Sequence, residues 1–165
     1  HVDFVIAYHD PDVVLAGAFE TLVIGHDQLV PVCKPDGAGA PLFAFDAPGI
    51  EMPFLRFGDG APISAPLAAL FEREALGARL RTVYANALAG ALRFRARAGD
   101  GVAWLPRSSV QADLESGVLV ETGDPGWVVD LEIRMFRDPK ASNRMTRTVW
   151  SFLDARKGAP LLQGM

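Results

Sequence analysis

The chain has 165 residues, a length that suits one domain or two small lobes. Sixteen Lys and Arg against 20 Asp and Glu give a formal net charge of −4. This charge argues against a chain whose own surface binds nucleic acid, because phosphate contacts need a basic face. A single cysteine, Cys33, excludes an internal disulfide and a cysteine-rich metal site. The apolar runs are too short to span a bilayer and no secretory signal pattern is visible, so we expect a cytoplasmic protein.

The first half of the chain contains short apolar runs that are typical of buried strands. We expect such strands at residues 4–7, 21–24 and 29–32. Residues 34–53 are rich in Pro and Gly, as is typical of a crossover between two lobes. Residues 53–57 predict the next strand, and an apolar stripe after it predicts a helix over about 65–76.

The second half alternates between strand and helix patterns. We expect strands at 81–84, 102–105 and 118–120, with helices at 86–98 and 108–116 between them. Residues 129–135 alternate between apolar and charged side chains, which predicts a half-buried strand. An apolar face that includes Met145 and Phe152 predicts a last helix over about 142–157. This order indicates an α/β fold with a mostly parallel sheet.

The pattern also predicts a division into lobes. The middle of the chain repeats the strand–helix unit fully, whereas the outer pieces look like parts of a second lobe that the chain leaves and re-enters. We therefore expect lobe I to comprise residues 1–35 and 123–157, lobe II to comprise residues 36–122, and a C-terminal tail to follow at 158–165.

Catalytic motifs are weak in this sequence. The three histidines lack the spacing of a metal site, and the turn glycines at 58–60 match neither a dinucleotide fingerprint nor a phosphate-binding loop. Ser64, Ser108 and Ser109 lack the context of a hydrolase nucleophile, and helix capping is the simpler interpretation. We therefore expect no enzymatic activity, no metal and no cofactor.

Two further features allow a functional and a structural interpretation. Cys33 lies at the end of an apolar run, which favours a small buried side chain, although the adjacent Lys34 is compatible with a reactive thiol. Arg93, Arg95 and Arg97 fall on one predicted helix. A solvated helix face is the expectation, with a nucleic-acid or partner surface as the alternative.

The better functional signal is architectural. Ligands of open α/β sheets bind beyond the carboxyl ends of strands, where helices begin. Three places of this kind occur, at residues 8–10, 57–64 and 84–86. The last two are followed by predicted helices, which begin at Ser64 and Asn86. The N-terminus of a helix attracts anions through the helix dipole and its N–H groups. Their convergence favours a small anionic or polar ligand over a purely capping role.

Several segments resemble one protein family. Residues 98–108, AGDGVAWLPRS, resemble the AGxGxAxLPxS segment of LysR-type transcriptional regulators. Residues 3–8, 27–32 and 114–120 also resemble that family, in family order and at family spacing. The likeness covers about residues 2–155, which is nearly the whole chain.

Within that family, the chain is most similar to the branch of the hypochlorite-responsive regulator. Methionines serve as oxidation sensors in that branch. Ile63 and Leu88 stand where two of these methionines align, and neither side chain can form a sulfoxide. The resemblance therefore implies the fold of that branch and not its stimulus.

The resemblance implies two Rossmann-like lobes of the type II periplasmic-binding-protein kind, with the first lobe incomplete at its N-terminus. It implies an effector-sensing domain that binds a small molecule between lobes, a homo-oligomer in which the helix at 65–76 is a dimer element, and DNA binding only through an N-terminal winged helix-turn-helix that precedes this chain. By family position, the effector-binding residues are Tyr8, Phe57, Gly58, Ser64, Ala85 and Asn86. Asn86 replaces a serine that is common at that helix start.

Two other functions remain open at this point. A solute-binding protein fragment that serves a transporter would have the same fold, and a signal or lipobox sequence would distinguish it. A small α/β enzyme would need a nucleophile–base pair or a metal cluster, and the sequence offers neither. No membrane partner is expected.

Overall fold

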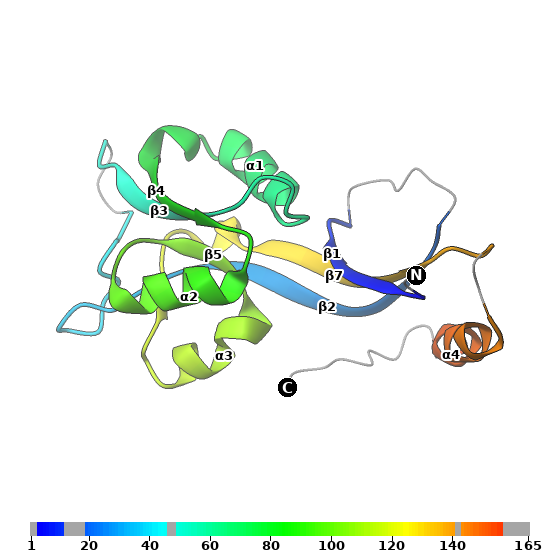
Figure 1. Ribbon diagram of the computed structural model, residues 1–165. Coiled ribbons are helices and arrows are strands. Elements are labelled where there is room, and N and C mark those ends of the chain that lie inside the picture. Colours follow the sequence, from blue (N-terminus) through cyan, green and yellow to red (C-terminus); the bar gives the residue numbers. More distant parts are fainter. Residues whose placement is uncertain (1–2, 12–18, 46–48, 141–142, 157–165) are drawn as a thin grey trace. The chain divides into compact units, whose positions relative to one another are not determined.

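The computed structural model describes residues 3–11, 19–45, 49–140 and 143–156 (Figure 1). The chain divides into two compact units. Unit 1 contains residues 1–27 and 130–165, and unit 2 contains residues 28–129. Within the described ranges, no helix combines the length and the apolar character needed to cross a bilayer. The expected tail at 158–165 lies outside the described residues.

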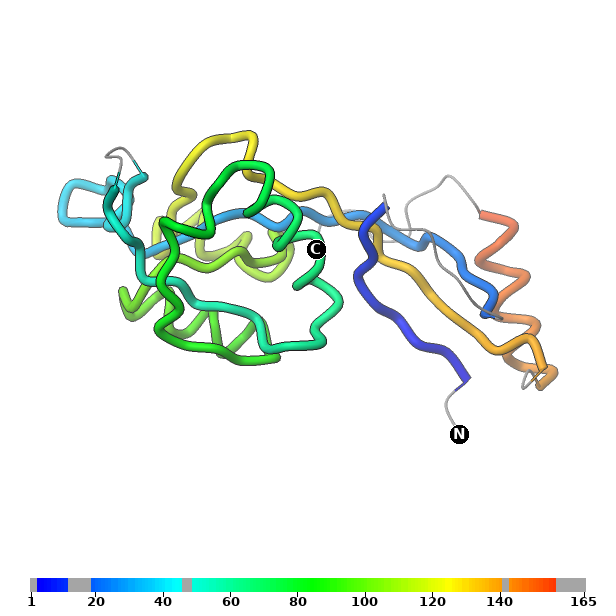
Figure 2. Tube along the Cα trace, turned by 90° about the horizontal axis from the view of Figure 1, so that it is seen from above, coloured from blue at the N-terminus to red at the C-terminus, as the bar shows by residue number. Residues whose placement is uncertain are grey.

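The described residues of unit 1 form a small sheet and one helix. Its strands are β1 (Val5–His9), the first part of β2 (Glu20–Cys33) and β7 (Val129–Arg137), in the spatial order β1-β7-β2. Strand β1 runs antiparallel to β7, and Figure 2 shows these two strands side by side in unit 1. The helix is α4 (Arg144–Asp154).

The core of unit 1 joins α4 to the sheet. Asn143 starts α4, because its Oδ1 accepts a hydrogen bond from the Thr146 amide at 3.0 Å. The helix turns Trp150 inward, toward a cluster formed with Leu22, Ile24 and Met135. The predicted apolar face is therefore wrong in part, since Met145 is 71% exposed and Phe152 is 53% exposed.

Unit 2 contains the second part of β2 and four further strands: β3 (Met52–Phe57), β4 (Leu80–Asn86), β5 (Ala103–Pro106) and β6 (Val120–Glu121). Strands β3 and β4 are parallel, and a parallel bridge joins Phe54 of β3 to Val102, the residue before β5. Strand β2 pairs antiparallel with both β5 and β6. The spatial order in this unit is therefore β4-β3-β5-β2-β6.

Helices cover this sheet. Figure 1 shows α1 (Ser64–Arg73) above the β3–β4 pair, and α2 (Ala89–Ala98) with α3 (Arg107–Glu115) below it. Two short 3₁₀ turns, η1 (Gly77–Arg79) and η2 (Pro125–Trp127), precede β4 and β7.

Trp104 on β5 is the centre of the unit 2 core. Its ring is buried and meets Phe71, Phe54 and Phe45 edge-on, at centroid distances of 5.0, 5.9 and 6.4 Å. Its Nε1 donates a hydrogen bond to the Trp127 carbonyl at 3.0 Å. Edge-to-face geometry is favourable for aromatic pairs, and the paired indole N–H removes the cost of burying it.

Two predictions about the sheet are wrong. The sheet is mixed and not mostly parallel, because β2 and β7 run against their neighbours. The strands expected at 21–24 and 29–32 form one continuous strand, β2, which belongs to unit 1 up to Asp27 and to unit 2 from Gln28. Two separate strands were predicted because residues typical of a turn lie between the two apolar runs. A strand that passes from one unit to the next can contain such residues.

Gly101 provides a test of the β3–β5 junction. A Cβ at Gly101 would lie 2.5 Å from the Pro53 carbonyl oxygen. At this point the Val102 amide donates a hydrogen bond to the Pro53 carbonyl, and the Leu55 amide donates one to the Val102 carbonyl. We expect Gly101→Ala to lower the free energy of unfolding by about 1–3 kcal/mol, because backbone must shift. Urea denaturation measures this change.

Gly90, inside α2, is the matched control. A Cβ there meets no atom within 4 Å, so Gly90→Ala should raise the free energy of unfolding by about 0.5–1 kcal/mol. A Gly101→Ala variant as stable as the unmodified chain would contradict the close approach of β3 and β5.

Candidate functional site

The carboxyl ends of β3 and β4 meet at one edge of unit 2. Phe57 and Asn86 are register partners in the parallel pair, and the Gly58 amide donates a hydrogen bond to the Asn86 carbonyl at 2.9 Å. Ala85 lies one residue earlier on β4, opposite Arg56. Four of the six predicted site residues are thus brought together by strand pairing.

Ser64 joins this group from the start of α1. Its Oγ donates to the Gly58 carbonyl at 3.3 Å, which ties the first turn of the helix to the end of β3. Ser64 is the first helical residue, and Ile63 holds the capping position without a side-chain bond. The expected capping role of Ser64 is therefore wrong, while its place beside the strand ends agrees with the sequence analysis.

Asn86 is fixed from both ends of its amide. Its Oδ1 accepts from the Leu88 amide at 2.9 Å, and its Nδ2 donates to the Tyr84 hydroxyl at 3.0 Å. The Arg95 guanidinium lies 5.1 Å from the Tyr84 ring centroid. Because α2 begins at Ala89, Asn86 closes the turn before the helix and does not cap it, contrary to expectation.

Tyr8 lies on β1 in unit 1, where its hydroxyl donates to Asp27 Oδ2 at 3.0 Å. The other five predicted residues all belong to unit 2. His9 beside it is buried, and neither imidazole nitrogen has a hydrogen-bond partner in the described part of the chain. The sequence placed His9 within the strand end at residues 8–10 and gave it no metal-ligand spacing, but did not predict its burial.

A groove of about 360 Å³ adjoins the strand ends, between α1 and the β3–β4 pair. Most of its lining is apolar, and the members are Phe54, Arg56, Phe57, Ser64, Leu67, Ala68, Phe71, Gly77, Leu80 and Thr82. Arg56 is the cation of this groove, and its Nη1 donates to Asp59 Oδ1 at 2.5 Å. This hydrogen bond and the positive charge lower the pKa of Asp59.

Sequence analysis missed Arg56. The available signal was one charged residue inside an otherwise apolar strand, PFLRF. Apolar neighbours partly shield a charge at such a position from water, so the charge needs a hydrogen-bonding or oppositely charged partner.

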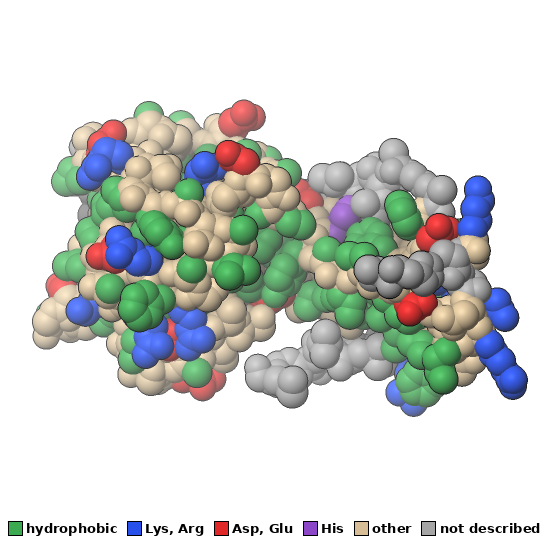
Figure 3. Space-filling model, viewed as in Figure 1, with side chains coloured by type: hydrophobic (Ala, Val, Ile, Leu, Met, Phe, Trp, Pro, Cys, Tyr) green, Lys and Arg blue, Asp and Glu red, His purple; other side chains and the backbone are tan. Residues whose placement is uncertain are grey.

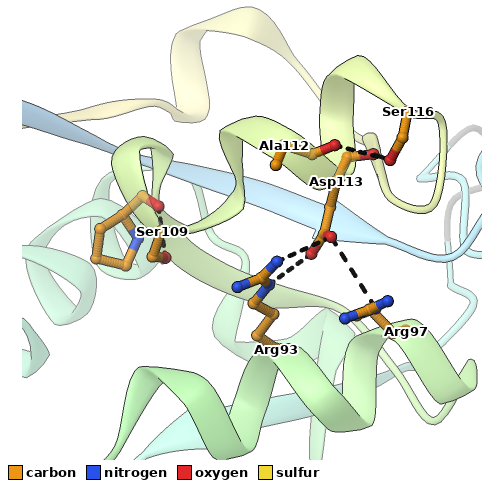
Figure 4. Close-up of polar contacts among 7 residues, drawn as sticks. Arg93, Arg97, Ser109, Ala112, Asp113 and Ser116 are labelled. Atoms are coloured by element: carbon orange, nitrogen blue, oxygen red, sulfur yellow. Dashed lines mark hydrogen bonds and ion pairs between the residues drawn. The ribbon is translucent and has the colours of Figure 1, made fainter. Parts of the chain in front are cut away.

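The arginines of α2 are divided between two partners. Figure 4 shows Arg93 and Arg97 turned toward Asp113 of α3. Arg93 binds both carboxylate oxygens, at 2.6 and 2.9 Å, and Arg97 lies 4.0 Å away. Arg95 pairs instead with Asp100 at 2.9 Å. Figure 3 likewise shows acidic and basic side chains together over α2 and α3, so this cluster is not an unpaired basic surface.

Burial and hydrogen bonding have opposite effects on the pKa of Asp113. Its side chain is almost fully buried, which alone would raise the pKa. The hydrogen bonds from Arg93 outweigh this effect, and the positive charges of Arg93 and Arg97 add to them, so the pKa of Asp113 is lowered. The carboxylate is therefore charged at neutral pH and fastens α3 to α2.

No group of three or more His, Cys, Asp or Glu side chains with metal-binding geometry occurs in the ranges that the structure describes. The site contains the Ser64 hydroxyl and the Asn86 amide, with the Arg56 guanidinium nearby, and these are groups that bind a polar or anionic molecule.

Residues 1–157 match the model of the LysR substrate binding domain. The chain belongs to this family. The predicted fold class, α/β with two lobes of the periplasmic-binding-protein kind, is confirmed by this match and by the LysR regulatory domains that share its structure. These relatives support a regulator over a transporter component.

Two curated relatives from Escherichia coli align with 148 residues of this LysR domain at 25% identity. The HTH-type transcriptional regulator YjiE (strain K12) is covered over 48% of its length, and the HTH domain-truncated transcriptional regulator QseD (O157:H7) over 60%. Both alignments cover 90% of this chain. The chain thus spans about half the length of the curated relatives it matches.

Solved structures show the same fold. The regulatory domain of HypT from Salmonella typhimurium in its apo-form has a TM-score of 0.81 at 22% identity, over 95% of this chain and 73% of that one. DarR from Vibrio fischeri, solved in complex with DNA, has a TM-score of 0.75 at 22% identity, over 92% of this chain and 50% of that one.

Ile63 and Leu88, the residues expected to align with two sensor methionines of the family branch, contain no sulfur. Ile63 is buried and Leu88 is exposed. Cys33 is fully buried, and burial raises the pKa of its thiol, although backbone hydrogen bonds from Phe43 and Leu42 act in the opposite direction. A buried thiol with a raised pKa is a poor nucleophile, so the structural interpretation of Cys33 holds.

The Asp113 contact predicts a pH-dependent stability. We expect Asp113→Asn to lower the free energy of unfolding by about 1–3 kcal/mol at pH 7, because Arg93 loses a charged partner. The lowered pKa of Asp113 stabilises the fold above the unfolded value of about 3.9, and this contribution disappears as pH falls through the folded pKa. The two proteins should therefore begin to converge in stability as the pH falls below about 4.

Asp100→Asn is the control, because Asp100 and Arg95 form a partly exposed pair whose loss should cost less than about 1 kcal/mol. Denaturant unfolding from pH 3 to pH 7 provides the comparison. A constant difference between Asp113→Asn and the unmodified chain across this range would contradict the assignment.

Proposed function

We propose that this chain is the effector-sensing domain of a LysR-type transcriptional regulator and that it binds a small anionic or polar molecule. The observation that carries this proposal is the meeting of two strand ends with the start of α1. Phe57, Gly58, Ala85 and Asn86 are held together by parallel pairing, and Ser64 reaches the same point.

The chemistry of these residues suits a polar ligand. Gly58 has no side chain to shield the backbone, and a Cβ there would only touch the Ala87 amide at 3.4 Å. The α1 start provides the positive end of a helix dipole, and Asn86 provides an amide that is already oriented by Tyr84. Such fixed dipoles favour an anion because they need little reorganisation on binding.

The role of unit 1 is proposed from the family. Tyr8 is its contribution to the effector site, and the lobes comprise residues 1–35 with 123–157 and residues 36–122. An effector shifts a regulator between two states only as far as it binds one of them more tightly. The domain would work in the cytoplasm, without catalysis and without a membrane partner.

The rest of the regulator is also proposed. DNA binding belongs to an N-terminal winged helix-turn-helix outside this chain, and α1 contributes to a homo-oligomer through its outer face. YjiE is an HTH-type transcriptional regulator, which supports the proposed DNA-binding region.

Asn86 provides the test. We expect Asn86→Ala to weaken effector binding about tenfold, since one hydrogen bond to a charged group contributes about 1.5 kcal/mol or more. Asn86→Ser should retain most of the affinity, because the hydroxyl can replace the amide donor. Thermal denaturation with a panel of small carboxylates and phosphorylated acids first identifies a stabilising ligand, and titration calorimetry then gives the affinities.

The oligomeric state is the control. Sedimentation of Asn86→Ala should match that of the unmodified chain, because Asn86 is bonded within its own turn and to Tyr84. If Asn86→Ala bound the identified ligand with unchanged affinity, the strand-end site would be wrong.

A further inference from the structure

The groove beside α1 has no role in the function proposed above. It lies wholly in unit 2, between α1 and the strands β3 and β4. Its volume of about 360 Å³ falls in the range of pockets that hold small ligands. It borders the proposed effector site at Phe57 and Ser64, but its deeper walls come from other residues.

The inner walls of the groove are apolar and aromatic. Phe54 from β3 and Phe71 from α1 meet edge-on at a centroid distance of 5.4 Å. Leu67 is buried beside them, whereas Phe71 and Leu80 keep part of their surface in water. A flat hydrocarbon body would remove this surface from water, at about 25 cal/mol for each Å² buried.

Arg56 gives the groove a positive charge. Residues at alternate positions of a strand share a face, so Arg56 and Phe54 lie on the same side of β3, and both line the groove. The present partner of Arg56 is Asp59, whose side chain is 90% exposed. An ion pair with so exposed a member is screened by water and contributes little.

A ligand carboxylate has an advantage over Asp59 at this position. A guanidinium carries five N–H donors in a planar fork that matches a carboxylate in a bidentate manner. Asp59 is bonded to one nitrogen, Nη1. Ser64 and Thr82 also line the groove and add polar side chains beside Arg56.

We propose that this groove binds a small amphipathic carboxylate. Its carboxylate pairs with Arg56 at the polar end, and its apolar body lies between α1 and β3, against Phe54 and Phe71. The charge of Arg56 and the apolar lining select this class over a neutral hydrocarbon and over a polyanion.

The first test compares two probes of the same shape. 2-Naphthoate carries the carboxylate, and 2-naphthamide is its neutral counterpart. Titration calorimetry on the unmodified chain at pH 7 should show one 2-naphthoate site with at least tenfold higher affinity than for 2-naphthamide. Equal affinities, or no binding of 2-naphthoate at millimolar concentration, would overturn the proposal.

The second test assigns the charge to Arg56. Arg56→Met keeps an unbranched apolar side chain but removes the charge. It should weaken the binding of 2-naphthoate at least tenfold and leave the affinity for 2-naphthamide within twofold of the unmodified chain. Arg81→Met is the matched control, because Arg81 lies on β4, outside the lining, and pairs with Glu51 at 3.4 Å. Equal losses in the two variants would overturn the role of Arg56.

The third test fills the groove. Ala68 is exposed and lines it, so Ala68→Phe should weaken both probes at least tenfold. Ala69 is the next residue of α1, and it is exposed and lies outside the lining. The affinity of Ala69→Phe for both probes should stay within twofold of that of the unmodified chain. Unchanged binding to Ala68→Phe would place the probes elsewhere.

Sedimentation distinguishes a small ligand from a second copy of the chain. If the chain is a dimer that Ala68→Phe dissociates and 2-naphthoate does not bind, another copy occupies the groove and the proposal is wrong. The proposed effector site depends on Asn86 and on ligands found by screening, so failure of the naphthoate tests leaves that function standing.

Discussion

The burial of the Trp104 indole is the constraint on which unit 2 depends. One ring meets aromatic side chains from β3, from α1 and from the segment before β3, while its N–H bonds to the carbonyl of Trp127. A core of this kind fixes distances and also directions, because edge-on contacts fail when a ring rotates. Strand β3 cannot move along α1 without breaking the contacts of Phe54 and Phe71.

This rigidity would keep the short side chains of the proposed effector site in place. The end of β3 is held by the aromatic core, the end of β4 is held by pairing to β3, and the turn after β4 is held by the amide of Asn86. Sites supported by regular elements keep their polar groups in place before a ligand arrives. The groove under α1 shares the same support, so both proposed ligand sites depend on one set of packed rings.

The sequence predicted those features that hydrophobic periodicity and family segments encode. The strands ending at Phe57 and Asn86 and the helix after Gly58 were expected. Strand pairing brought four of the six site residues together, and the hydrogen bond from Ser64 to Gly58 added the fifth. Partners that depend on tertiary structure were missed. The Arg93–Asp113 bond joins residues 20 positions apart, and the continuity of β2 depends on neighbours that lie far along the chain. The inward face of α4 was misjudged because Trp150 and Met145 are equally apolar in sequence and only the sheet decides between them.

The protected state of Cys33 makes the molecule convenient for spectroscopy. The native thiol is buried and its pKa is raised, so a maleimide or nitroxide reagent at neutral pH should leave it unmodified. A cysteine introduced at an exposed position on each unit would then be the only reactive pair. Fluorescence or spin-label distances between these two positions would follow the response of the domain to an effector, without any need to remove the natural cysteine first.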